Sequence, residues 1–253
     1  MAFAGSVVVA APAIALSGTT LSVTGTADTT GPCTLNGSSG TCPALRSAVD
    51  YADQNPSTSV VIVLPGGYYP LEKRLGTLDV TTPSALTISG AGASSTVVEG
   101  GGSAGLDTTL VSVSSGADVT LSELTLSGGA SSRGGGDLYN DGTLAVSDAT
   151  VTDGYSSDDG GAVYNDSSGV LTLGLGTVVS DSQAPGGDGG GVYNAAGGSV
   201  TVGGATLRDD TAQYGGAVYN AGDLIVGSGS SFTGDSALTE EAGAIDNDAG
   251  VVS

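Results

Sequence analysis

The chain has 253 residues, of which 39% are hydrophobic but only 4% aromatic, and it contains no Trp and no His. Lys and Arg number 5 against 26 Asp and Glu, a formal net charge of −21. Because nucleic acids and anionic lipids both attract clustered cations, this balance argues against nucleic acid and membrane surfaces as partners. With few aromatic residues, we expect a core of many thin aliphatic columns in one elongated domain.

Residues 1–15 have features of a secretory signal. Val7 to Leu16 is apolar, and Ala13-Ile14-Ala15 fits a signal-peptidase site. The stretch is shorter than the roughly 20 residues that cross a bilayer, and no Lys or Arg precedes Arg46. We interpret residues 1–15 as the remnant of a truncated signal peptide, with a first strand as the alternative. No later segment suggests membrane insertion, so we predict an extracellular or cell-surface location.

Residues 16–58 are predicted to form an N-terminal cap. The alternation in Leu21-Ser22-Val23-Thr24 predicts a strand. The only cysteines, Cys33 and Cys42, stand nine positions apart, and in an exported chain this spacing favours a local disulfide.

A helix is predicted over Pro43–Gln54. Pro43 suits its first turn, and Leu45, Ala48, Val49 and Ala52 share one face. We expect this helix to cover the end of the core, because an uncovered coil would expose unpaired strand edges.

Residues 59–253 are dominated by a repeated segment of the form Gly-Gly-x-x-Tyr-Asn. Its Asn recurs with steps of 25, 29, 26 and 27, a period typical of a solenoid. Short apolar runs such as Val60–Leu64 lie between turn-forming residues, and the 45 glycines disfavour helix. The sequence therefore predicts an all-β chain forming a right-handed parallel β-helix of about seven coils and about 35 Å. Its last strand, Val251-Val252-Ser253, has no cap, so we interpret the chain as part of a longer protein, or as one whose open end meets a partner or another copy.

Stacking of the coils would place equivalent residues over one another. Val163, Val192, Val218 and Ile245 should form an inward aliphatic column, and the paired glycines should allow a tight corner before each strand. The amides should form a hydrogen-bonded ladder of Asn140, Asn165, Asn194, Asn220 and Asn247. A stacked aromatic row on the outside should comprise Tyr139, Tyr164, Tyr193 and Tyr219. We interpret this row as coil stacking, with binding of sugar rings as the alternative.

The order of motifs resembles secreted bacterial β-helix proteins that carry an N-terminal CSLREA element followed by polymorphic outer-membrane-protein-like repeats. The matching residues run from 21 onward: Val23-Thr24-Gly25-Thr26-Ala27-Asp28, Cys42 with Leu45-Arg46-Ser47-Ala48, Val63-Leu64-Pro65-Gly66-Gly67-Tyr68, Thr87-Ile88-Ser89-Gly90, and the Gly-Gly-x-x-Tyr-Asn coils. The resemblance implies a surface-exposed or secreted protein and no catalytic residues.

Enzymatic activity is an alternative, because β-helices also include polysaccharide lyases and hydrolases. Glycoside hydrolysis needs two positioned carboxylates, and the doublets Asp158-Asp159 and Asp209-Asp210 are the candidates. We expect both doublets to be solvated turn residues. With no His, and only Arg133 and Arg208 as basic residues after Arg74, we predict no catalytic, cofactor or metal site.

The acidic residues have consequences of their own. Gly186-Gly187-Asp188-Gly189-Gly190 resembles a calcium-binding nonapeptide but occurs once, without its tandem partner. Carboxylates about 5 Å apart in neighbouring coils repel by roughly 0.8 kcal/mol, so we expect salt or Ca²⁺ to stabilise the protein non-specifically.

We therefore predict a non-catalytic structural or adhesive module that binds a glycan, a surface protein or itself. The alternative is a polysaccharide lyase or glycoside hydrolase. An ice-binding face is disfavoured, because Thr150, Thr177 and Thr206 are not part of a Thr-x-Thr array.

Overall fold

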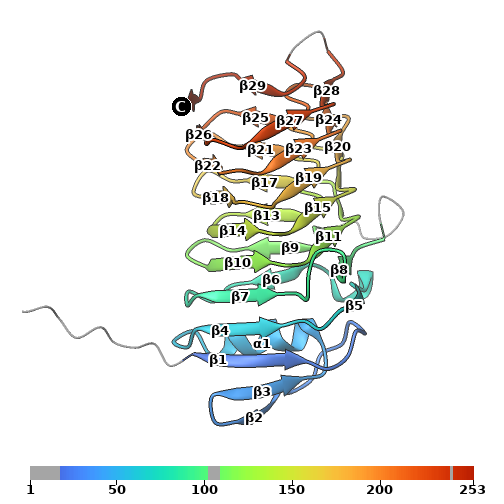
Figure 1. The fold of residues 1–253 in the computed structure, drawn as a ribbon, viewed down its shortest axis with the longest axis vertical. Coiled ribbons are helices and arrows are strands. Elements are labelled where there is room, and N and C mark those ends of the chain that lie inside the picture. The colour runs from blue at the N-terminus through green and yellow to red at the C-terminus, as the bar shows by residue number, and fades with distance from the viewer. Residues whose placement is uncertain (1–17, 102–108, 240–241) are drawn as a thin grey trace, which may run out of the picture.

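The computed structural model describes residues 18–101, 109–239 and 242–253, and shows a parallel β-solenoid of about seven turns (Figure 1). Four sheets, here called A to D, run along its axis. In the described residues the only α-helix is α1, Leu45–Gln54, and a 3-10 turn, η1, spans Lys73–Leu75. The predicted fold class is confirmed.

Sheets A and B form two walls of the solenoid. Sheet A contains β2 (Thr34–Asn36), β3 (Ser39–Cys42), β1 (Thr19–Val23), β4 (Val60–Val63), β7 (Leu86–Ser89), β10 (Asp118–Ser122), β14 (Thr143–Ser147), β18 (Val170–Leu173), β22 (Ser199–Val202), β26 (Asp223–Val226) and β30 (Val251–Val252). Sheet B contains β5 (Gly67–Pro70), β8 (Thr96–Glu99), β11 (Thr125–Ser127), β15 (Thr150–Thr152), β19 (Val178–Ser180), β23 (Thr206–Arg208) and β27 (Ser231–Thr233).

Sheets C and D close the remaining sides. Sheet C contains β6 (Leu78–Val80), β9 (Val111–Val113), β13 (Leu138–Asn140), β17 (Val163–Asn165), β21 (Val192–Asn194), β25 (Val218–Asn220) and β29 (Ile245–Asn247). Sheet D is shorter and contains β12 (Ala130–Ser131), β16 (Tyr155–Ser156), β20 (Gln183–Ala184), β24 (Thr211–Ala212) and β28 (Ser236–Ala237).

The core consists of aliphatic columns, because coils pair in parallel and in register. In sheet C, Leu138, Val163, Val192 and Val218 are buried over one another and the column ends at Ile245. Equivalent columns line sheet A, where alternate residues point inward. Burial of each such side chain contributes about 1.5–3 kcal/mol, so these columns stabilise the solenoid as far as Leu224, beyond which no hydrophobic residue of the described ranges is fully buried.

A glycine corner precedes the strands of sheet C, as the sequence predicts. Gly160, Gly189 and Gly215 have φ of +65°, +66° and +57°. A Cβ on any of them would lie 2.3–2.4 Å from the carbonyl oxygen three residues later. Both the backbone conformation and the close approach therefore require glycine here.

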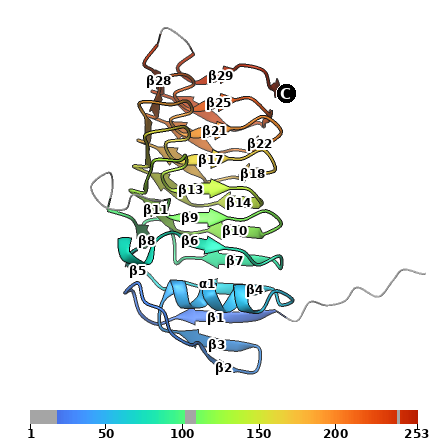
Figure 2. The same ribbon diagram turned by 180° about the vertical axis from the view of Figure 1, so that it is seen from behind.

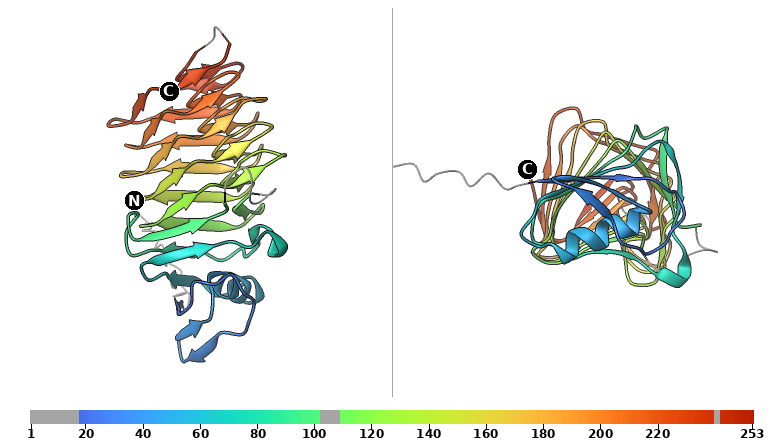
Figure 3. Two further views of the ribbon diagram at one scale, coloured as in Figure 1. Left: turned by 90° about the vertical axis from the view of Figure 1, so that its right-hand side faces the viewer. Right: turned by 90° about the horizontal axis from the view of Figure 1, so that it is seen from below.

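The N-terminal cap continues sheet A beyond the coils. β1 pairs in parallel with both β3 and β4, and β2 pairs with β3 in an antiparallel hairpin. α1 lies across the N-terminal end of the solenoid opposite these strands (Figure 3), and it buries Leu45, Ala48, Val49 and Ala52. The helix thus has the place and the buried face predicted for it.

The predicted start of the helix is wrong by two residues. Cys42 still pairs with Val23 in sheet A, and its carbonyl accepts a hydrogen bond from the backbone N–H of Thr24. Ala44 is extended, with φ −149° and ψ 163°. Pairing with β1 therefore keeps the chain extended through Pro43, and the helix begins at Leu45.

A disulfide and an ion pair stabilise the cap. Cys33 and Cys42 are bonded, with their Cα atoms 4.3 Å apart. The buried Arg46 guanidinium donates to both carboxylate oxygens of Asp28, at 2.8 and 3.0 Å, and to the carbonyls of Gly76 and Thr77. Arg46 thereby connects α1 with the loop that contains Asp28, 18 residues earlier, and with the turn after η1. The predicted signal remnant, residues 1–15, lies outside the described residues.

Candidate functional site on the outer face of sheet C

A column of four tyrosines runs along the outer face of sheet C. The tyrosines belong to β13, β17, β21 and β25, which Figure 2 shows as successive strands. Neighbouring ring centroids are 5.3, 5.0 and 5.3 Å apart, and the ring planes differ by 1°, 18° and 2°. All four side chains are half-buried. The structure thus places Tyr139, Tyr164, Tyr193 and Tyr219 in a stacked outer row, with both faces of the two inner rings covered by neighbouring rings.

An amide ladder lies behind the tyrosines, on the inner face of the same strands. Each Nδ2 donates to the Oδ1 of the next coil at 2.7–2.8 Å, in the order Asn140, Asn165, Asn194, Asn220 and Asn247. The first four of these side chains are fully buried. This ladder confirms the prediction, and it fixes the register in which the tyrosines stack.

A polar groove of about 730 Å³ lies at the N-terminal end of the tyrosine column. In strand register, the column continues from Tyr139 to Ser112 and then to Asp79, so the aromatic stack stops at Tyr139. Side chains along its wall include Thr109, Ser131, Ser132 and Arg133. The groove therefore combines one aromatic ring with hydroxyls, a carboxylate and a guanidinium.

An acidic pocket of about 290 Å³ lies at the other end of the column. It is lined by Asp188, Tyr214, Tyr219, Asp246 and Asp248. Burial, and then the charges of Asp159 and Asp246, raise the pKa of Asp188 to about 6. Burial, and then a hydrogen bond and charge from Asp248, raise the pKa of the Tyr219 phenol. Asp188, singled out in the glycine-rich segment, thus belongs to this pocket.

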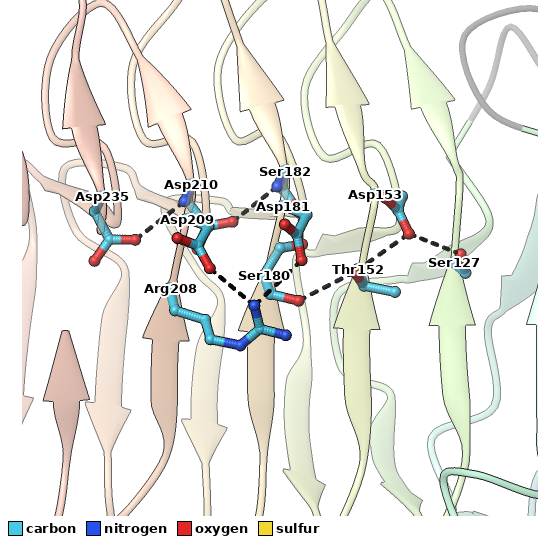
Figure 4. Close-up of polar contacts among 10 residues, drawn as sticks. All are labelled: Ser127, Thr152, Asp153, Ser180, Asp181, Ser182, Arg208, Asp209, Asp210 and Asp235. Carbon is cyan, nitrogen blue, oxygen red and sulfur yellow. Dashed lines mark hydrogen bonds and ion pairs between the residues drawn. The ribbon is translucent and has the colours of Figure 1, made fainter. Parts of the chain in front are cut away.

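The doublet Asp209-Asp210 lies at the corner between sheets B and D (Figure 4), and neither residue lines either hollow. Asp153, Asp181 and Asp209 follow their sheet B strands with φ of +59°, +58° and +59°. The Arg208 guanidinium binds Asp209 at 2.9 Å and Asp181 at 3.5 Å. These carboxylates therefore shape a turn and neutralise a basic residue.

The expectation that both residues of this doublet are solvated is wrong for Asp210. Its side chain is fully buried, because the corner turns it inward while Asp209 points outward. Its Oδ1 accepts from the backbone N–H of Ser182 at 2.9 Å, and its own N–H donates to Asp235 Oδ1 at 3.1 Å. Asp210 thus hydrogen-bonds the backbone of a neighbouring coil.

The other doublet also departs from that expectation. Asp158 is exposed, but Asp159 is half-buried, and its Oδ1 accepts from the backbone N–H of Asp188 at 2.9 Å. Neither doublet presents two carboxylates to a groove, so neither has the arrangement that glycoside hydrolysis needs.

Three inward carboxyls were not recognised in the sequence. Among the described residues, the buried side-chain oxygens without a hydrogen-bond partner are the Oδ2 atoms of Asp137, Asp210 and Asp235. Burial raises the pKa of all three, that of Asp137 well above its ordinary value, that of Asp210 to about 8 and that of Asp235 to about 6. With a pKa of about 8, Asp210 is held largely as the neutral acid at pH 7. Burial favours the neutral form of Asp137 as well, whereas Asp235, with a pKa of about 6, is largely ionised at pH 7.

Comparisons with known proteins do not assign the chain to a family. No protein-family model and no curated protein matches it. It is similar to a solved structure, ORF18 of Geobacillus virus E2, at 12% sequence identity and a TM-score of 0.22, over 80% of this chain and 57% of the viral protein. A likeness at this TM-score carries no argument, and the resemblance to CSLREA proteins stays a prediction. In the part of the chain that the structure describes, no helix is long and apolar enough to cross a membrane.

Proposed function

We propose that this protein is a non-catalytic β-solenoid module, secreted or on the cell surface, that binds a glycan through the outer face of sheet C. The tyrosine column is the observation that carries the proposal, because four parallel, half-buried rings lie on one face and both ends of the row meet a polar hollow. Aromatic side chains with a few convergent polar groups are typical of ligand-binding surfaces. Sugars suit such a surface, since each ring has an apolar C–H face and a rim of hydroxyls.

An extracellular or surface location is supported by the cap. The bond between Cys33 and Cys42 joins residues of an exposed loop and a sheet strand, and structural disulfides persist mainly in oxidising compartments. The net charge of −21 keeps such a chain soluble.

Binding of a panel of neutral oligosaccharides, measured by calorimetry, tests the proposal. Replacing the two terminal rings in a Tyr139→Thr/Tyr219→Thr variant should weaken binding by about ten-fold or more, because each ring contributes stacking energy of about 1 kcal/mol. Tyr68, which is 53% exposed on sheet B, provides the matched control Tyr68→Thr. Wild-type protein that binds no neutral glycan, or a double variant that binds as wild type, would contradict the proposal. Binding only to a surface protein or to a second copy would replace the glycan with that partner.

Glycoside hydrolysis is a second candidate, favoured by the acidic pocket alone. Asp188, with its raised pKa, lies with Asp246 and Asp248 beside the Tyr219 ring, and a carboxylic acid of raised pKa together with a carboxylate is the usual pair in such enzymes. New reducing ends released by the wild type from any bound glycan, and lost in Asp188→Asn, would establish this activity. Binding without product release would leave the non-catalytic proposal standing.

A further inference from the structure

We propose that the groove beside Tyr139 is a saccharide subsite that holds one pyranose ring of a neutral glycan against the free face of that tyrosine. The inference rests on the proposed function and specifies where on sheet C the sugar binds, and which class of sugar.

The column ends because a small residue takes the next position. Ser112 of β9 pairs with Tyr139 of β13 in strand register, and Asp79 of β6 pairs with Ser112. Figure 2 shows β6, β9 and β13 as successive strands of this face. The ring of Tyr139 is stacked by Tyr164 on one side only. Its other face is therefore directed toward Ser112, where a fifth ring would lie if the column continued.

The groove supplies the polar partners that a sugar needs around that ring. Arg133 is exposed and forms no ion pair within the described residues. Asp79 is also exposed, and it pairs with Ser112 on the side away from Tyr139. A guanidinium only donates hydrogen bonds and a carboxylate only accepts them, whereas a sugar hydroxyl does both. The hydroxyl rim of one pyranose ring can thus bridge Arg133 and Asp79 while its C–H face lies on Tyr139.

Charge selects a neutral sugar. The chain carries −21 overall, which repels polyanions such as uronic-acid polymers over the whole surface. Within the groove, the single cation Arg133 is offset by Asp79. A uronate would gain one ion pair against this repulsion, whereas a neutral hexose meets no electrostatic penalty.

The opposite end of the column is less suited to the same ligand. Asp246 follows Tyr219 in register, and the smaller pocket there is lined by three carboxylates and two tyrosines, without a cation. The N-terminal groove is the larger of the two and contains both donors and acceptors.

Extending the column by one ring tests this subsite. In Ser112→Tyr, the new ring should stack on Tyr139 as the native tyrosines stack on each other and fill the place proposed for the sugar. We expect affinity for the best binder among cellohexaose, chitohexaose and mannohexaose to fall by about ten-fold or more. The matched control is Thr172→Tyr, which adds the same ring to the outer face of sheet A and should bind as wild type.

A second variant does not depend on stacking. Arg133→Gln shortens and neutralises an exposed side chain, so the fold should persist while affinity falls by about five-fold or more. Hexagalacturonate should bind the wild type at least ten-fold more weakly than the best neutral hexaose. Full wild-type affinity in both folded variants, checked by circular dichroism, would overturn the subsite while leaving the proposed function intact. Wild-type protein that binds none of the neutral hexaoses would instead refute the proposed function itself.

Discussion

Asp210 couples the stability of the solenoid to pH. Its carboxyl group is fully buried, with one oxygen bonded to the Ser182 N–H and the other unpaired. Burial is the largest cause of its raised pKa, and the acidic groups Asp235, Asp181 and Asp209 raise it further. The neutral form is therefore the one that fits the fold.

Stability should fall as pH rises from about 5 to 8. Between the unfolded pKa, about 3.9, and the folded value of about 8, the native state binds the proton and the unfolded state does not. The free energy of unfolding then decreases by about 1.4 kcal/mol per pH unit for this group. Asp235, with a folded pKa of about 6, adds to the decrease over the lower part of the range. Urea unfolding at several pH values between about 5 and 8 measures this decrease in the free energy of unfolding.

The isosteric Asp210→Asn variant isolates this contribution. It keeps the acceptor for the Ser182 N–H and removes the ionisation, so the pH dependence should become shallower and the variant should exceed wild type in stability at pH above about 8. A wild-type stability that rises from pH 5 to 8 would contradict a neutral Asp210.

Asn194 should be more important for stability than its counterpart at the end of the ladder. It donates to Asn220 and to the carbonyl of Asp223, and accepts from Asn165. Asn194→Ala removes the amide donor of the buried Asn220 Oδ1 and interrupts the ladder in its middle, so we expect a loss on the order of 3 kcal/mol in chemical denaturation. The control Asn247→Ala removes an exposed amide and should cost less than about 1 kcal/mol. Equal losses in the two variants would show that the ladder contributes nothing specific.

The sequence predicts some of these residues well and others poorly. The residue types of Val163, Tyr164 and Asn165 recur in successive coils. The period alone therefore predicts which column each side chain belongs to, whether it faces inward or outward, and which residues lie next to it in the stack. Asp210 lies in a column whose members change from coil to coil, since its neighbours in the stack are Ser182 and Asp235. The direction of such a side chain depends on the positive φ of the preceding residue, which the doublet itself does not reveal.

At the level of elements, the ion pair between Asp28 and Arg46 explains why the cap is a fixed part of the solenoid. Arg46, in the first turn of α1, bonds Asp28 and two carbonyls after η1, and Asp28 also accepts from the backbone N–H of Glu72. A helix, a cap loop and the connection between sheets B and C thus meet at one guanidinium.

Replacing Arg46 should destabilise the protein strongly. Arg46→Met leaves the Asp28 carboxylate buried without its counter-ion, so the free energy of unfolding should fall by about 3–5 kcal/mol. Arg74, whose pair with Glu72 is exposed, gives the control Arg74→Met, with an expected loss below about 1 kcal/mol. A small loss for both, measured in urea, would mean that the cap folds without this contact.

The groove beside Tyr139 could not be predicted from the repeat. The coil that contains β9 lacks the Gly-Gly-x-x-Tyr-Asn motif, so the sequence does not show that Ser112 continues the tyrosine column. The pairing of Ser112 with Tyr139 in the strand register establishes that Ser112 continues the column. The repeat therefore predicts the regular part of sheet C, while the candidate site lies where the repeat stops.

For the whole molecule, the acidic surface should make stability depend on salt. Asp153, Asp181 and Asp209 occupy one corner position in successive coils, about 5 Å apart. Their repulsion is screened at physiological ionic strength. We expect the thermal midpoint to rise between about 20 and about 150 mM NaCl, and an unchanged midpoint would refute this.

Glycine at the same corner provides the control. Gly128 and Gly234 occupy this position in other coils, with φ of +68° and +76°. Asp153→Gly should fold, remove one charge from the column and reduce the dependence on NaCl. Calcium at matched ionic strength should stabilise the protein about as much as NaCl does if the effect is screening.

The one-way direction of the amide ladder has a consequence for how such a chain can change in length. Asn165, Asn194 and Asn220 each donate a hydrogen bond to the following coil and accept one from the preceding coil, so the coils that contain them have the same chemistry at both boundaries. Excising the 29 residues from Asp166 to Asn194 would bring Asn165 against Asn220 with the hydrogen-bond pattern intact. Duplication or loss of whole coils is therefore a route by which this scaffold can adjust its reach while both ends keep their own surfaces.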